Sequence, residues 1–273
     1  MNNYLLITTL LGGLLLTGCS NHVLKKDLVI QANNKVVWAD DGSDVVVVKH
    51  NKDNPSNQAH FKHQVSVQNI DGSGQRTITE WRDYQVDQIF YMKQAGYFIV
   101  ESKLDNGVRR FDKINASGHE ILIIETPDSE HQPCRGKKNT ASNISKLPQV
   151  HHTVIPSPDG QQLAHIYSPE CRKVTVEFLH ANNLNIFDNQ TVDIDEPMKT
   201  RWHSDGYVIL STYNNDKAWK IIPLTLPLPV LPPKCLLPVT TSSDVSLGGK
   251  KVYFEGNKLA TKDVGRQKAF GCQ

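Results

Sequence analysis

A glycine turn followed by a short apolar run recurs five times along this chain of 273 residues. Each run is rich in β-branched or aromatic residues, which favours strands, and no stretch of a dozen residues carries a convincing helical period. The turn glycines are Gly42, Gly96, Gly160, Gly206 and Gly249. The last two steps between them, 46 and 43 residues, match the roughly 40–45 residues of a four-stranded propeller blade. The body of the chain is therefore predicted to be all-β and built from repeats, with loops inserted where the steps are longer.

A second set of turns lies out of phase with the first. Ile70–Gly74 precedes the run Arg76–Thr79, and Ile114–Gly118 precedes the run Glu120–Ile124, a step of 44 residues. Such glycine-containing tips supply the positive φ that a tight hairpin needs. Within one blade, the first set of turns would join strands a and b, and the second set would join strands c and d.

One repeat carries a recognisable motif. Ser157-Pro158-Asp159-Gly160-Gln161-Gln162-Leu163-Ala164 resembles the S-P-D-G-x-x-L-A core of TolB-type, WD-like propeller repeats; the resemblance is partial at Trp202–Gly206 and weak in the other units. It implies a β-propeller, in which radial blades protect the sheet edges. Five a–b turns predict five blades within residues 27–273, and Lys25–Gln31 could complete the last blade by pairing near the C-terminus. A β-sandwich or a short open repeat array is the competing architecture.

The N-terminus predicts export. Leu5–Leu16 is an uncharged run of 12 residues, typical of a secretory signal and shorter than the roughly 20 residues that a membrane-spanning helix needs. It ends in Leu16-Thr17-Gly18-Cys19, which resembles the lipobox of bacterial lipoproteins. The resemblance implies a signal peptide of residues 1–18, cleavage before Cys19, acyl chains such as palmitate on Cys19, and a tether of residues 19–26.

The predicted lipid anchor also predicts where in the cell the protein is located. In enteric-type sorting, Ser20 after the lipidated cysteine implies export to the outer membrane. At about 0.8 kcal/mol per buried CH₂, two or three acyl chains attach a protein to a membrane without further help. The n-region Met1–Tyr4 lacks Lys and Arg, which departs from the usual signal peptide. An uncleaved anchor or a coincidental cysteine is the alternative.

Four further cysteines suit an oxidising, periplasmic or extracellular compartment. They are Cys134, Cys171, Cys235 and Cys272. An even count in an exported chain predicts two disulfides, with three possible connectivities. Because the first two and the last two are each 37 residues apart, we expect the pairs Cys134–Cys171 and Cys235–Cys272. There is no C-x-x-C and no Cys/His cluster at zinc spacing, so neither a metal nor another cofactor is predicted.

Composition narrows the classes of partner. The hydrophobic set makes up 38% of the chain and charged residues 21%, with a mean hydropathy of −0.41, which indicates a globular body rather than a multi-span membrane protein. The net charge is only +2. Nucleic acid is therefore not an expected partner, because a phosphate-binding surface needs a larger or strongly clustered basic excess.

No catalytic constellation stands out. Asp40, Asp41, Asp87 and Glu101 could serve a glycan-active enzyme at the propeller mouth, but acidic residues at propeller turns more often cap backbone amides. His151-His152 cannot share one metal ion from a strand, because adjacent side chains point to opposite faces. The tryptophans are expected to fill the core between blades, rather than to form a sugar-stacking surface; they are Trp38, Trp81, Trp202 and Trp219.

Three stretches interrupt the repeats. Thr126–Gln149 is predicted to be a long inter-blade loop, and Asn51–Gln58 a polar tip between strands b and c. Pro223–Pro238 carries six prolines among leucines and valines, which predicts a polyproline-II-like connection rather than a central strand. Its leucines form either a docking strip or an inter-blade strut, and the strut is favoured because Cys235 would tether the segment to the C-terminus.

The function expected from these features is that of a lipid-anchored protein-binding or scaffold module for another envelope protein. Its contacts are expected on turns and long loops carried by a rigid frame. A glycan-active enzyme using mouth carboxylates is the alternative. A fold alone establishes neither role.

Overall fold

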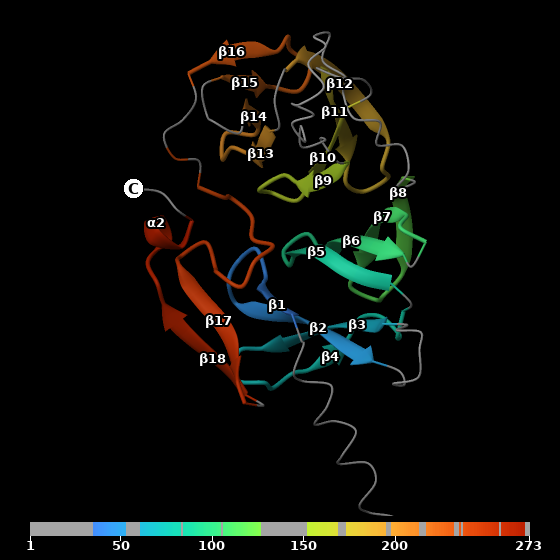
Figure 1. The fold of residues 1–273 in the computed structure, drawn as a ribbon, viewed down its shortest axis with the longest axis vertical. Coiled ribbons are helices and arrows are strands. Elements are labelled where there is room, and N and C mark those ends of the chain that lie inside the picture. The colour runs from blue at the N-terminus through green and yellow to red at the C-terminus, as the bar shows by residue number, and fades with distance from the viewer. Residues whose placement is uncertain are drawn as a thin grey trace, which may run out of the picture.

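The computed structural model describes residues 35–52, 61–82, 84–104, 106–126, 152–168, 173–194, 198–212, 217–231, 235, 237–256 and 258–270. Within these residues the chain forms five antiparallel sheets that radiate from a common centre (Figure 1). In each of the first four sheets, four strands follow one another in sequence order from the centre outward. Radially arranged four-stranded meanders define a β-propeller, so the predicted fold class is confirmed.

We number the sheets as blades 1 to 5 in chain order. The strands of blade 1 are β1 (Lys35–Trp38), β2 (Asp44–Lys52), β3 (Phe61–Asn69) and β4 (Arg76–Thr77). The strands of blade 2 are β5 (Tyr84–Met92), β6 (Tyr97–Leu104), β7 (Arg109–Asn115) and β8 (Glu120–Thr126). The strands of blade 3 are β9 (Thr153–Pro156), β10 (Gln162–Tyr167), β11 (Lys173–His180) and β12 (Ile186–Asp193).

The last two blades differ in completeness. The strands of blade 4 are β13 (Met198–Trp202), β14 (Val208–Thr212), β15 (Ala218–Ile221) and β16 (Leu228–Val230). Blade 5 consists of β17 (Lys250–Glu255) and β18 (Lys258–Asp263), and the short helix α2 (Arg266–Ala269) follows it. Among the described residues, no helix is long and apolar enough to cross a bilayer.

Both predicted sets of turns are where the repeats place them. The five turn glycines have φ between +68° and +85°; four of them join the first two strands of blades 1 to 4, and Gly249 immediately precedes β17. Gly72 and Gly118 lie in the c–d turns of blades 1 and 2, with φ of +84° and +86°. Gly249 also permits a close approach, because a Cβ there would lie 2.3 Å from the backbone nitrogen of Arg266. Only glycine combines this backbone conformation with this proximity.

The S-P-D-G motif folds into a hydrogen-bonded turn between β9 and β10. Ser157 Oγ donates to Asp159 Oδ1 at 2.6 Å and accepts from the backbone nitrogen of Gln162 at 2.9 Å. Asp159 Oδ1 also accepts from the nitrogen of Gln161. The carbonyl of Gly160 accepts a hydrogen bond from the Tyr97 hydroxyl of blade 2. The motif therefore stabilises its own turn and ties blade 3 to its neighbour.

The hydrophobic core lies between the blades rather than at the axis. One cluster of buried residues joins blades 2, 3 and 4, a second joins blades 1 and 2, and a third joins blade 1 to Val252 of blade 5. Strands buried on both faces explain why the apolar runs are continuous, such as Val45–Val48, rather than alternating.

The segment 241–246 takes the innermost position beside blade 5. The carbonyl of Ser243 accepts from the Trp38 backbone nitrogen, and the carbonyl of Asp244 accepts from the Trp38 indole, each at 3.1 Å. Asp244 also accepts from the nitrogen of Val252 in β17, and Val245 forms a bridge with Lys251. Figure 1 shows this part of the chain running in to the centre and back out to β17. Because blade 5 has two regular strands and Lys25–Gln31 lies outside the described residues, the five-blade count and its closure stay predictions.

Two predicted interruptions need correction. Strand β2 continues through Asn51 to Lys52, paired with β3, so the predicted b–c tip begins later than Asn51. The proline-rich stretch is not wholly a connection, since Leu228–Val230 forms the outermost strand of blade 4. An edge strand tolerates Pro229 because only one of its sides must supply ladder hydrogen bonds. Most of the predicted long loop, residues 127–149, lies outside the described residues.

Candidate functional site

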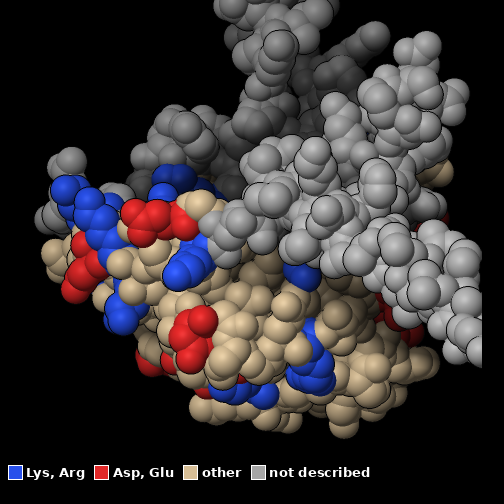
Figure 2. Space-filling view, turned by 90° about the horizontal axis from the view of Figure 1, so that it is seen from below, with Lys and Arg blue, Asp and Glu red and all other residues tan. Residues whose placement is uncertain are grey.

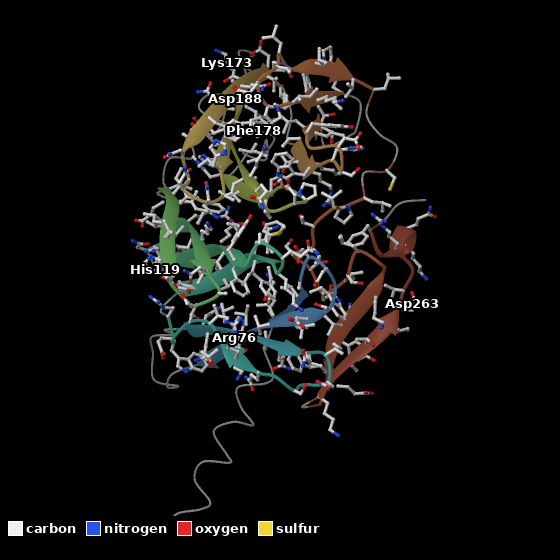
Figure 3. All side chains as sticks on the ribbon, turned by 180° about the vertical axis from the view of Figure 1, so that it is seen from behind. Arg76, His119, Lys173, Phe178, Asp188 and Asp263 are labelled. Atoms are coloured by element: carbon white, nitrogen blue, oxygen red, sulfur yellow. The ribbon has the colours of Figure 1, made fainter. Side chains whose placement is uncertain are left out.

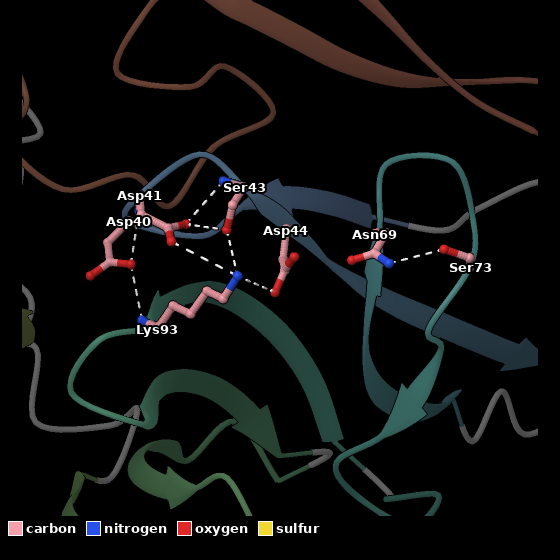
Figure 4. Close-up of polar contacts among 7 residues, drawn as sticks. All are labelled: Asp40, Asp41, Ser43, Asp44, Asn69, Ser73 and Lys93. Carbon is pink, nitrogen blue, oxygen red and sulfur yellow. Dashed lines mark hydrogen bonds and ion pairs between the residues drawn. The ribbon is translucent and has the colours of Figure 1, made fainter.

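The predicted carboxylates Asp40 and Asp41 stabilise the a–b turn of blade 1 (Figure 4). Asp40 Oδ1 accepts from the backbone nitrogens of Asp41 and Lys93, at 2.8 and 2.9 Å. Asp41 Oδ1 accepts from both the nitrogen and the hydroxyl of Ser43. Burial raises the pKa of Asp40 above its usual value, although these backbone hydrogen bonds oppose the shift. Both carboxylates therefore do structural work, and Asp40 joins blade 1 to blade 2.

Asp87 and Glu101 belong to a separate ion-pair network. Arg109 Nη2 lies 2.6 Å from Glu101 Oε1 and 3.4 Å from Asp87 Oδ2, and Lys35 Nζ donates to the Asp87 carbonyl. Burial raises the pKa of Glu101, and the positive charge of Arg109 opposes this. Asp87 precedes Lys93 by six residues along one strand and its turn, roughly 20 Å at the usual rise. Asp40 and Asp41 therefore lie apart from Asp87 and Glu101. The latter two carboxylates both contact Arg109 Nη2, so they are engaged with that guanidinium and are not left as an acid and base pair for a glycosidase.

A histidine network on blade 3 includes one of the two predicted histidines. His151 lies outside the described residues, whereas His152 Nδ1 lies 2.9 Å from His165 Nε2. His165 Nδ1 in turn lies 2.8 Å from Glu177 Oε2, and Glu177 Oε1 accepts from Tyr167. Burial lowers the pKa of His165, and Glu177 opposes this shift. The sequence did not single out His165 or Glu177, because only the pairing of β10 with β11 makes them neighbours.

A second buried histidine lies between blades 1 and 2. His63 is 1% exposed, and its Nδ1 accepts a hydrogen bond from the backbone nitrogen of Val86 at 3.2 Å. The ring centroids of His50 and His63 are 4.1 Å apart. Burial, with a contribution from His50, lowers the pKa of His63 to about 4. His63 is therefore neutral in the folded protein at physiological pH.

This shift predicts acid sensitivity. Between the unfolded pKa of 6.5 and the folded value of about 4, the unfolded chain binds more protons, so the free energy of unfolding should fall as the pH falls, by up to about 3 kcal/mol. His63→Asn should make the chemical-denaturation stability depend less steeply on pH across this window. Some slope should persist, because burial lowers the pKa of His50 and His165 in the same direction. His203→Asn is the control, and an unchanged slope in His63→Asn would contradict the account.

The tryptophans behave as expected for core residues where they precede a–b turns. Trp38 and Trp202 are 3% and 2% exposed. The indole of Trp202 donates to the Ile155 carbonyl of blade 3 at 3.0 Å, as the indole of Trp38 donates to Asp244. Trp81 and Trp219 are half-buried. Trp38 and Trp202 therefore connect neighbouring blades and do not form a sugar-stacking surface.

Among the described residues, four of the seven exposed large apolar side chains lie in the proline-rich stretch. Their exposed fractions are 74% for Leu224, 82% for Leu226, 49% for Leu228 and 91% for Leu231. We call these four residues the leucine strip. It runs from the β15–β16 turn along the outermost strand β16. The strut interpretation is therefore wrong for these leucines, because a strut would bury them.

Blade 3 holds the turn that carries the strip. Asp188 Oδ2 accepts from the backbone nitrogen of Leu224 at 2.7 Å, and Gln190 Nε2 donates to the Ile222 carbonyl at 2.7 Å. Asp188 lies on β12, the outermost strand of blade 3 (Figure 3). Leu224 has a φ of +63°, which is unfavourable for a side chain with a Cβ. Hydrogen bonds from a neighbouring blade thus keep this leucine in a strained and exposed conformation.

Charged groups elsewhere on the surface are mixed in sign. On the face shown in Figure 2, basic and acidic side chains lie next to one another among uncharged residues. Several basic and acidic groups pair with one another, such as Lys93 with Asp44 and Arg110 with Asp112. Within the described ranges, no three His, Cys, Asp or Glu side chains form a group that could hold a metal ion.

The predicted lipidation and disulfide sites fall mostly outside the described residues. This applies to Cys19, Cys134, Cys171 and Cys272. Cys235 is described and is disulfide-bonded. Its predicted pairing with Cys272 stays a prediction.

Comparisons with known proteins give fold likeness only. No protein-family model matches the sequence, and no curated protein matches it. The chain is similar to the propeller domain of the Trilobed protease from Pyrococcus furiosus, with 9% identity, a TM-score of 0.46, and 85% of this chain and 70% of that chain covered. It is also similar to TolB from Acinetobacter baumannii, with 10% identity and a TM-score of 0.41. That match covers 86% of this chain and 52% of TolB, so the chain spans about half of that protein. A third similar structure is an acylaminoacyl peptidase from Pyrococcus horikoshii, with 7% identity and a TM-score of 0.45. That match covers 72% of this chain and 32% of the peptidase.

These likenesses are too weak to transfer a function. The propeller fold follows from the chain's own radial sheets, its turn glycines and its inter-blade cores.

Proposed function

We propose that this chain is a lipid-anchored β-propeller of the bacterial cell envelope that binds another envelope protein through the leucine strip. The exposure of the strip carries the proposal, because four exposed leucines within eight residues are more than the isolated apolar residues of an ordinary surface and indicate an interaction site. The hydrogen bonds from Asp188 and Gln190 add to it, since they hold the strip's turn in place before a partner arrives. A preordered segment loses less conformational entropy on binding.

The anchor is the second part of the proposal and rests on the sequence. The lipobox-like Leu16–Cys19 and the uncharged run before it support lipidation of Cys19. Ser20 supports the outer membrane as the destination. A protein at this location would meet partners in the same envelope compartment, and the acyl chains would hold the propeller near such a partner.

An envelope glycan-active enzyme is the less favoured alternative. The carboxylates that could have served it are divided between a turn and a buried ion-pair network at different points along blade 2. None of them is left as a closely spaced acid and base pair without a structural partner.

A double substitution tests the leucine strip. Leu226→Ser with Leu228→Ser should weaken capture of the partner, by crosslinking and affinity purification from intact membranes, about tenfold or more, because each buried leucine contributes roughly 1.5–3 kcal/mol to an interface. The melting temperature should change little, since both side chains are exposed in the free protein. Ile121→Ser with Leu122→Ser on the outer strand of blade 2 is the matched control and should capture normally. Normal capture by the blade 4 variant would refute the proposed surface.

A further inference from the structure

A cavity of about 290 Å³ lies near the centre of the propeller. Its walls come from the inner strands β5, β9 and β13 and from the segment 238–242. This volume is close to the lower end of the range for small-molecule sites, about 300–1,000 Å³, and suits a ligand the size of a monosaccharide or an amino acid. The leucine strip, on the outermost strand of blade 4, is not part of it.

The charged groups of the lining are all basic. Lys199 and Arg201 line the cavity, and no Asp or Glu does. The two lie two residues apart on β13, so they share one face of that strand. Both basic groups of the lining therefore come from the same strand.

Arg201 lacks a compensating carboxylate. Its side chain is exposed, the protein atoms around it lower the pKa of its guanidinium, and no acidic side chain opposes this shift. Among the described residues, no hydrogen bond or ion pair involves the Arg201 side chain. By contrast, the guanidinium of Arg109 contacts two carboxylates. An arginine beside the cavity whose donors have no protein partner is available to bind an anion.

Neutral donors complete the lining. Gln88 Nε2 donates to Ser242 Oγ at 2.9 Å, so the Ser242 hydroxyl hydrogen stays available to donate to a ligand. Thr153 and Thr240 add hydroxyl groups. The Trp202 indole already donates to the Ile155 carbonyl, so it is not a donor for a ligand. The Arg201 guanidinium and the hydroxyl donors suit a small ligand that carries an oxyanion.

We infer that this cavity binds a small molecule bearing a carboxylate or phosphate group, with Arg201 as its principal contact. The planar guanidinium presents two parallel N–H donors, which match two oxygens of either group. Ser242 donates to a further oxygen. The site does not depend on the proposed partner surface, because none of these residues belongs to the leucine strip.

Calorimetric titration of the full chain in detergent tests this site with inorganic phosphate, glucuronate and uncharged glucose as probes. At least one of the two anions should bind saturably, and glucose should not bind. Binding of phosphate would indicate recognition of a phosphate group, and binding of glucuronate would indicate recognition of a carboxylate. Raising the NaCl concentration should weaken the binding. Arg201→Gln should weaken it at least about tenfold, equivalent to about 1.4 kcal/mol. Arg201→Lys, which keeps the charge and loses the planar fork, should retain part of the affinity.

Arg76→Gln is the matched control, since Arg76 lies on the outer strand of blade 1 (Figure 3) and does not line the cavity. It should bind the anion as tightly as the wild-type protein. The inference is wrong if neither anion binds the wild-type protein at about 10 mM, ten times a Kd of about 1 mM. It is also wrong if Arg201→Gln folds with an unchanged melting temperature and binds as tightly as the wild type. If Arg201→Gln does not fold, the wild-type protein tests the inference: the inference is wrong if added NaCl does not weaken anion binding or if glucose binds as tightly as the anion.

Discussion

Trp202→Ala is expected to lower the free energy of unfolding by about 3–5 kcal/mol, as for large buried aromatic side chains in general. Trp202 is 2% exposed and connects blades 3 and 4. Its ring meets that of Phe178 edge-on, with centroids 5.7 Å apart, and its indole donates to the Ile155 carbonyl. Alanine would leave a cavity between the blades and remove the indole hydrogen bond to the Ile155 carbonyl. Urea denaturation followed by circular dichroism measures the change.

Two further variants separate the contributions at this position. Trp202→Phe should cost less than Trp202→Ala, because it keeps most of the packing and loses the hydrogen bond, worth about 1 kcal/mol. Trp219→Ala, at a half-buried position, should also cost less. If Trp202→Ala were no more destabilising than Trp219→Ala, the inter-blade core would not depend on this side chain.

Cys19→Ala is expected to abolish lipid labelling altogether and to remove the protein from the membrane fraction, or to leave it unprocessed. The lipobox-like quartet makes this cysteine the predicted attachment point of the acyl chains. Metabolic labelling with palmitate, followed by membrane fractionation, measures the outcome. Cys235→Ala controls for the loss of a cysteine and should keep its label. An unlabelled Cys19→Ala protein that stayed inserted in the membrane would indicate an uncleaved helix instead.

The repeat architecture could be predicted because its determinants are local. A turn that needs positive φ selects glycine, and strands buried between blades select continuous β-branched runs. Both preferences can be recognised directly in the amino-acid sequence. Gly42, Gly96, Gly160 and Gly206 accordingly lie in the turns between the first two strands of their blades. The S-P-D-G motif was the most specific of these sequence features, since its serine hydroxyl and aspartate carboxylate form hydrogen bonds within the same turn.

The polar networks could not be predicted, because their members meet only across strands or blades. His165 and Glu177 are brought together by the β10–β11 register, and Arg109 meets Asp87 and Glu101 across blade 2. The central cavity joins Gln88 to Ser242, 154 positions further along the chain. No spacing rule links residues so far apart.

The state of the proline-rich stretch depended on the neighbouring blade. The number of its leucines indicated that either the propeller or a partner covers them, and the strut was favoured because Cys235 would tether the segment to the C-terminus. The structure instead attaches the backbone of the turn to Asp188 and Gln190 of blade 3, which leaves the side chains outside. Only the position of blade 3 distinguishes these two outcomes.

Site-specific photocrosslinking at Leu226 tests the proposed function most directly. A photoreactive residue there, in intact cells, should form a defined adduct with one envelope protein, because Leu226 is 82% exposed in the middle of the leucine strip. The same residue placed at Leu122, on the outer strand of blade 2, should not form that adduct. Unlabelled propeller domain added to permeabilised cells should compete the adduct away. Absence of an adduct at Leu226, or the same adduct at both positions, would contradict a partner that docks on blade 4.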